Sequence, residues 1–100
     1  MEAKLLRVIN ECNEYLDREA IDEVMHFYNH GEFEMALEGL LIEMINAKEY
    51  PKKCQISDVI SLCYYYKIDK ESVFDSEIWN KFLNWKKEYL EHSQANRHTF

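Results

Sequence analysis

The chain has 100 residues, enough for one folded domain with its own core but too few for a separate regulatory module. Hydrophobic residues make up 47% of it and aromatic residues 14%, which excludes intrinsic disorder despite a net charge of −7. Residues 1–50 hold 12 acidic and 4 basic side chains, whereas residues 51–100 hold 7 and 8. Concentrated like charge disfavours the compact state, so this asymmetry predicts a basic partner.

Turn-forming residues are scarce, since the chain contains only two glycines and one proline. This scarcity predicts an all-α fold, a single-domain bundle of about five helices over residues 1–92 with a polar, frayed tail over residues 93–100. Three cysteines at no metal-binding or redox spacing indicate free thiols and a cytoplasmic location. No signal peptide and no uncharged apolar run of about 18 residues is present, so we expect no membrane span.

The first two helices are predicted from apolar residues at three- and four-residue spacing. The stripe from Leu5 to Leu16 predicts a helix over residues 2–16. Asp17 is a suitable N-cap for a second helix, which Gly31 ends.

The third helix is predicted within residues 31–50 and should be the most buried, because its apolar stripe is the widest. Its own core or a second subunit can bury that stripe, so the oligomeric state stays open. Glu34 and Glu38 lie one turn apart and are expected on a narrow exposed edge. Gly39 costs about 1 kcal/mol of helix propensity relative to alanine, which predicts the close approach of another helix.

The last two helices follow a loop that contains Pro51. Ser57 and Asp58 offer N-cap chemistry for a short fourth helix that reaches Tyr66, although the run of three tyrosines at its end also suits a strand. The final helix is expected over residues 76–92, with a cap at position 75 or 76 and a heavily aromatic stripe.

No pattern of residues predicts a catalytic, metal or cofactor site. His26 and His30 share a helix face, but no third ligand lies at a conventional interval, and two exposed histidines near a helix C-terminus explain the pair. The carboxylates fall at positions that the helical pattern assigns to solvent, and no phosphate-binding loop occurs. An enzyme remains an alternative only if a cleft holds a buried carboxylate with a raised pKa.

Direct nucleic-acid binding is also not expected. Lys81, Lys86 and Lys87 accompany Trp79 and Trp85 in the last helix, a combination that can bind single strands by charge and stacking. However, both tryptophans fall on the apolar stripe, and the net charge repels a polyanion. We interpret the tryptophans as core residues and the lysines as solvating groups.

Residues 27–45, FYNHGEFEMALEGLLIEMI, combine an aromatic pair, a short turn at Gly31 and an Ala-Leu-Glu segment that leads into Leu40 and Leu41. This stretch resembles small immunity proteins of bacterial polymorphic toxin systems, of the MafI and CdiI types linked to contact-dependent growth inhibition. The resemblance implies a cytoplasmic, non-enzymatic protein that binds the C-terminal domain of a cognate toxin and neutralises it. Such toxins are often nucleases, including tRNases, with basic surfaces. Gly31, Ala36, Leu37 and Leu40 of the stretch are expected to fix the turn and the core.

An acidic surface is the expected binding site for such a basic toxin. The predicted partner-binding residues come from the acidic faces of the first two helices and the edge of the third: Glu11, Glu14, Glu19, Asp22, Glu23, Glu34 and Glu38. Exposed aromatic side chains should supply additional affinity, and the candidates are Tyr15, Phe27, Tyr28 and Tyr65. The alternative function is a non-inhibitory helical adaptor that binds a basic protein or peptide.

Overall fold

Five helices account for the secondary structure of the computed structural model, which describes the backbone of residues 1–98 and the side chains of residues 1–93. They are α1 (Glu2–Cys12), α2 (Arg18–Asn29), α3 (Phe33–Asn46), α4 (Ile56–Tyr65) and α5 (Ile78–His98). No strand occurs in the described part of the chain, so the predicted all-α, five-helix fold is confirmed and the strand alternative for the tyrosine run is wrong. None of the described helices is both long and apolar enough to cross a membrane.

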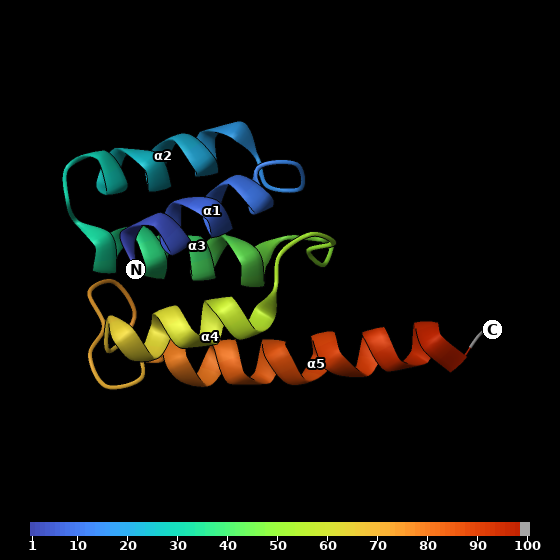
Figure 1. The fold of residues 1–100 in the computed structure, drawn as a ribbon. Helices are drawn as coiled ribbons and strands as arrows, with labels where there is room; N and C mark the ends of the chain where they lie inside the picture. Colours follow the sequence, from blue (N-terminus) through green and yellow to red (C-terminus); the bar gives the residue numbers. More distant parts are fainter. Residues whose placement is uncertain (99–100) are drawn as a thin grey trace.

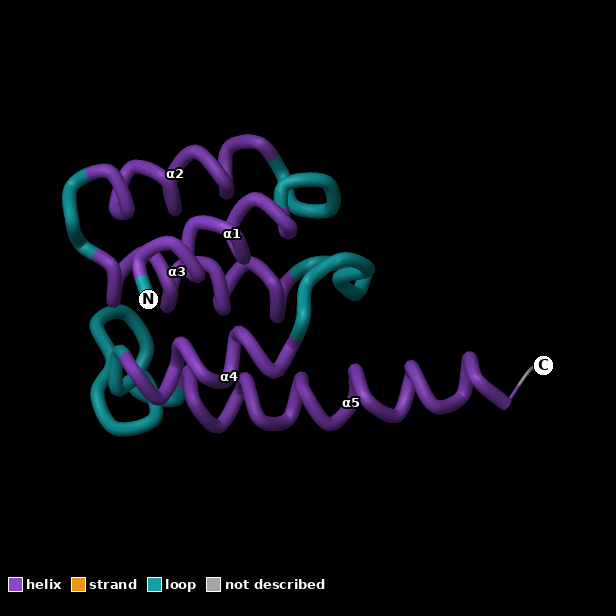
Figure 2. Tube along the Cα trace, in the orientation of Figure 1, coloured by secondary structure: helices purple, strands orange, loops and turns teal. Residues whose placement is uncertain are grey.

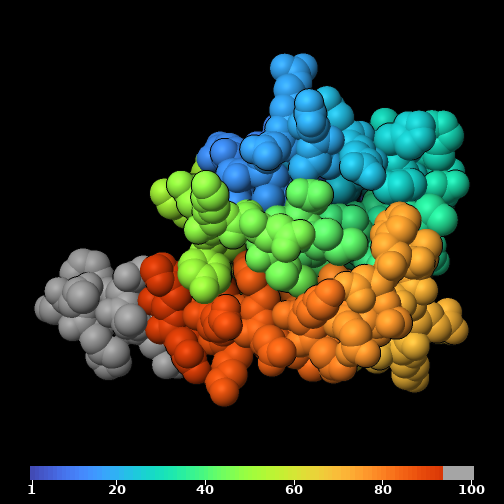
Figure 3. All heavy atoms as spheres, turned by 180° about the vertical axis from the view of Figure 1, so that it is seen from behind, coloured from blue at the N-terminus to red at the C-terminus, as the bar shows by residue number. Residues whose placement is uncertain are grey.

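The helices form two layers with α3 at the centre. α1 and α4 lie on the face seen in Figure 1, α3 and α5 lie on the opposite face seen in Figure 3, and α2 runs along one edge (Figures 1 and 2). The most extensive helix contact joins α2 to α3, and α3 also packs against α5 and α1. The radius of gyration is 13.2 Å, close to the ~13 Å expected for one folded domain of this length.

The core is built mainly from aliphatic side chains of the first four helices and aromatic side chains of α5. Its fully buried residues include Leu5, Val8, Ile9, Leu37, Leu40, Leu41, Met44, Leu62 and Phe82. Along α5, the rings of Trp79, Phe82, Trp85 and Tyr89 stack in succession, with neighbouring centroids 5.5–5.8 Å apart. The tryptophans therefore pack on the core as predicted, and Trp85 is almost fully buried.

Two of the helices end in the same hydrogen-bonded turn. After α2, the N–H of Gly31 bonds the carbonyl of Tyr28 and the N–H of Glu32 bonds that of Phe27, a Schellman motif that confirms Gly31 as the helix stop. Gly31 has φ +73°, which glycine adopts without strain. The equivalent position after α4 is Lys67, whose φ of +62° places a side-chain-bearing residue in the left-handed region.

Several helix boundaries differ from the predicted ones. α1 ends at Cys12 rather than residue 16, because the chain turns there toward α2, yet Leu16 is still buried. α5 continues to His98, so residues 93–98 of the predicted tail are helical, and residues 99–100 lie outside the described part of the chain.

The starts of the last two helices also differ from the predicted ones. Gln55, not Ser57 or Asp58, is the N-cap of α4. Asp58 instead lies in the first turn, where its carboxylate pairs with Arg7 of α1 at 3.0 Å. α5 begins at Ile78 rather than at residue 76. Just before it, the carboxylate of Asp75 accepts a hydrogen bond from the N–H of Glu77 at 2.9 Å.

The expected role of Gly39 in a close helix approach is not supported. A Cβ atom built on Gly39 would meet Val24 of α2 at 3.7 Å, an ordinary van der Waals distance. The packing of α2 on α3 would therefore accept alanine, which favours helix by about 1 kcal/mol.

Candidate protein-binding surface

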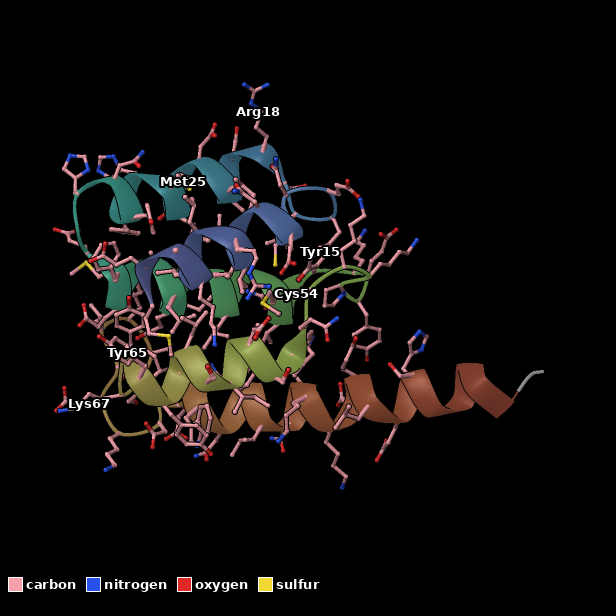
Figure 4. All side chains as sticks on the ribbon, in the orientation of Figure 1. Tyr15, Arg18, Met25, Cys54, Tyr65 and Lys67 are labelled. Carbon is pink, nitrogen blue, oxygen red and sulfur yellow. The ribbon has the colours of Figure 1, made fainter. Side chains whose placement is uncertain are left out.

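The outer face of α2 carries exposed carboxylates that have no cationic partner. Glu19, Asp22 and Glu23 are all exposed and share this face because they are three or four residues apart. Among the described side chains, none of the three forms an ion pair or a hydrogen bond. Arg18 begins the same helix but projects away from the protein (Figure 4). The three charges are therefore available to a partner.

The two predicted site residues near the end of α1 are already paired with cations of this chain. Glu11 lies 3.6 Å from Arg7, and one of its carboxylate oxygens is buried without a hydrogen-bond partner in the described structure. Glu14 is exposed and accepts a hydrogen bond of 2.7 Å from Lys53. A partner would have to compete with these cations, so Glu11 and Glu14 are weaker candidates than the carboxylates of α2.

On α3, the two predicted site residues have different environments. Glu34 is exposed, as expected. Glu38 is completely buried, which contradicts its prediction as an exposed partner-binding residue. Its carboxylate accepts hydrogen bonds from the backbone N–H groups of Val73, Phe74 and Asp75 at 2.6, 2.7 and 2.8 Å. The segment between α4 and α5 covers this side of α3, and Glu38 satisfies three of its donors.

The aromatic side chains predicted as anchors are mostly tied into the fold. Tyr15, Phe27 and Tyr28 are partly buried and pack against the core. The hydroxyl of Tyr28 donates to the carbonyl oxygen of Glu2 at 3.2 Å. Burial raises the pKa of Tyr15, and its hydroxyl has no hydrogen-bond partner within the described structure. Of the four, only Tyr65 is mostly exposed, at 60%, and its ring packs edge-on against that of Tyr66.

Phe74 and Val73 were missed as candidate anchors. Phe74 is 50% exposed and Val73 49%, although both are large apolar side chains held in place through their backbone bonds to Glu38. The ring of Phe74 also packs on that of Phe27 of α2, with centroids 5.7 Å apart. An apolar pair inside the otherwise polar segment KESVFDSE was the sequence signal that could have identified them.

The three thiols are buried and belong to the core. Burial raises the pKa of Cys63 to about 12. The interaction of Cys12 of α1 with Cys54 of the α3–α4 loop lowers the pKa of Cys12 and raises that of Cys54. Cys54 and Tyr15 lie close together at this end of α1 (Figure 4). Buried thiols of this kind act as apolar packing groups.

His26 and His30 are exposed at the end of α2, as predicted. Their rings lie 4.4 Å apart, and Nδ1 of His30 is 2.8 Å from the carbonyl oxygen of His26. Among the described side chains, no group of three or more His, Cys, Asp or Glu residues is arranged to hold a metal ion. The pair is explained by local contacts at the helix end.

Comparisons with protein-family models, with curated proteins and with solved structures found no match to this chain.

Proposed function

We propose that this chain is an immunity-type inhibitor that binds a basic toxin domain, such as a nuclease or tRNase, and neutralises it. The observation that carries the proposal is the exposed carboxylate face of α2, formed by Glu19, Asp22 and Glu23 without cationic partners in the described structure. Leaving like charges together is unfavourable for the free protein, and a positively charged partner removes that cost.

Electrostatics would give this inhibitor a fast encounter with its target. Clustered carboxylates steer a basic protein into contact, raise the association rate at low salt and can occupy a cleft that binds phosphates. Protection against a lethal enzyme requires a dissociation constant of about 1 nM, equivalent to about −12 kcal/mol. Exposed ion pairs supply at most about 1 kcal/mol each, so apolar anchors must provide slow dissociation. Phe74 is the best placed, because Phe27 of α2 contacts it.

The proposal is tested by expressing the toxin domain encoded directly upstream of this chain, with and without the chain, and by measuring growth and complex formation. Rescue of growth together with a stable complex supports immunity. Absence of both removes the proposal, and complex formation without rescue favours the alternative of a non-inhibitory adaptor.

Charge reversal tests the surface itself. Asp22→Lys combined with Glu23→Lys should slow association at low salt by about 10-fold or more and reduce its dependence on salt. The matched control is Glu88→Lys combined with Glu91→Lys, which makes the same charge change at exposed positions of α5. If both double variants slow association equally, net charge rather than the α2 face governs binding, and the surface assignment is wrong.

A further inference from the structure

A small groove lies between α2 and α3, in the face where the exposed carboxylates of α2 are found. Its lining residues are Ala20, Val24, Phe27, Gly39, Ile42 and Phe74, with Glu23 and Glu43 also at its wall. The elements that supply them meet on the face shown in Figure 3, where α2 is blue to cyan, α3 green and the α4–α5 segment orange. The groove has a volume of about 130 Å³, whereas small-molecule sites usually have 300–1,000 Å³. It suits a single side chain.

Gly39 gives the groove its depth. Glycine disfavours the middle of a helix, and the packing of α2 against α3 does not require it, since a Cβ atom there would lie at an ordinary 3.7 Å from Val24. A methyl group at this position would instead occupy space in the groove, because Gly39 is one of its lining residues. Glycine at position 39 therefore weakens the helix and leaves space in the groove, as expected if another side chain occupies that space.

The walls of the groove show what chemistry the occupant should have. The lining is mostly apolar, while Glu23 and Glu43 supply two carboxylates, one from each helix. Neither carboxylate has an ion-pair partner among the described side chains. A long aliphatic chain with a terminal cation matches both features. Arginine fits better than lysine, because its planar guanidinium is less strongly hydrated and its several N–H donors can bind two carboxylates at once.

We propose that this groove binds an arginine side chain on the surface of a basic protein partner, with the aliphatic stem over Gly39 and the guanidinium between Glu23 and Glu43. The identity of the partner as a toxin domain depends on the proposed function. The preference for arginine depends only on the lining of the groove. The bound arginine would bring apolar burial and charge pairing together at one position, which is the character of an interface hot spot.

The test uses N-acetyl-arginine methylamide as the probe and amide NMR shifts of the whole protein as the readout, so it needs no toxin. The matched probe is N-acetyl-citrulline methylamide, which has the same shape without the charge. We expect the arginine probe to shift the amide signals of Gly39 and Phe74 with a dissociation constant of about 1 mM at low salt, and the citrulline probe to bind at least 10-fold more weakly.

Three variants make the result specific. Gly39→Ala should abolish the shifts while raising the melting temperature by about 4 °C, so that loss of binding cannot come from loss of folding. Glu23→Gln combined with Glu43→Gln should reduce arginine binding to the level of citrulline. Glu88→Gln combined with Glu91→Gln, which changes the same charge on α5, should leave binding unchanged.

The proposal is overturned if the arginine probe produces no shift at Gly39 up to about 20 mM, far above the expected dissociation constant. Equal binding of citrulline, or full binding to the Gly39→Ala variant, would also overturn it. If the chain binds the arginine probe but does not rescue growth, the proposed toxin partner is wrong and the arginine site stands. If the chain rescues growth but does not bind the probe, the proposed function stands and the arginine site is wrong.

Discussion

Glu38 should be among the largest single contributors to stability outside the apolar core. Both carboxylate oxygens are acceptors: one binds the N–H of Val73, and the other binds those of Phe74 and Asp75. The side chain has no exposed surface, so water cannot replace these bonds if the carboxylate is lost. The informative change is Glu38→Gln, which keeps the shape of the side chain and replaces one acceptor oxygen with an NH2 donor.

The cost follows from the three bonds. If the amide oxygen takes the place of the oxygen that binds two N–H groups, the NH2 group faces the N–H of Val73 and one charged hydrogen bond, worth about 1.5–3 kcal/mol, is lost. The two bonds that remain become neutral and weaker. A total loss of about 3 kcal/mol would lower the melting temperature by about 12–24 °C in a domain of this size. The native fold should persist below that transition, since small domains have about 5–15 kcal/mol of stability.

The assay is urea and thermal unfolding followed by circular dichroism, with amide hydrogen exchange of residues 73–75 as a local readout. Glu34→Gln is the matched control, because it makes the same change one turn earlier on the exposed side of α3 and should alter stability by less than about 0.5 kcal/mol. A Glu38→Gln variant as stable as Glu34→Gln, with unchanged exchange at residues 73–75, would refute the reasoning.

Three further outcomes follow from local geometry. Residues 31 and 67 both occupy the left-handed position of a Schellman motif, which glycine adopts without strain. Gly31→Ala should therefore lower the free energy of unfolding by about 1 kcal/mol, and Lys67→Gly should raise it by a similar amount. Urea unfolding tests whether the two changes in free energy have opposite signs. Hydrogen bonds from Lys81 and from the N–H of Glu77 lower the pKa of Asp75 below its ordinary value of 3.8. The ionised carboxylate therefore stabilises the fold fully above pH 3.8, and this stabilisation is lost as the pH falls through the pKa of Asp75 in the folded protein. Asp75→Asn should therefore reduce stability at pH 7 and flatten its decline in acid, and an unchanged acid limb would contradict this assignment. Finally, a disulfide reagent should find no reactive thiol in the folded protein and three in urea, because Cys12, Cys54 and Cys63 are all buried; a thiol that reacts at once without denaturant would contradict that burial.

Helix number and the residues of the core could be predicted from the sequence because both depend on local periodicity. The stripes of α1, α2 and α3 identify Leu5, Val24 and Leu37 as buried, and the structure agrees. Gly31 could be assigned as a helix stop because its role depends only on its own backbone. Ala36, Leu37 and Leu40, which were expected to fix the core, are also fully buried.

Glu38 could not be assigned correctly because its environment is created by a segment 35 residues further along the chain. A helical pattern identifies a face of α3, but it does not say which loop will cover that face. The same reasoning applies to Glu14 and Asp58, whose cationic partners come from other elements. Counting acidic residues in the sequence therefore overestimates the charge that a partner can contact. Among the described side chains, the carboxylates on the outer face of α2, together with Glu34, are the exposed ones of the predicted site left without a cationic partner.

The buried carboxylate and the groove are physically connected, which links the stability of this domain to the surface we propose for binding. Glu38 holds the backbone of Phe74, and the ring of Phe74 lines the groove beside Gly39. Gly39 follows Glu38 directly on α3, so one turn of helix both fixes the anchor and opens the space next to it. A rigid anchor loses little conformational entropy when a partner binds, which favours slow dissociation. Glu38→Gln should therefore weaken arginine binding even at temperatures where the variant is fully folded, although Glu38 itself lies beneath the surface and touches no partner.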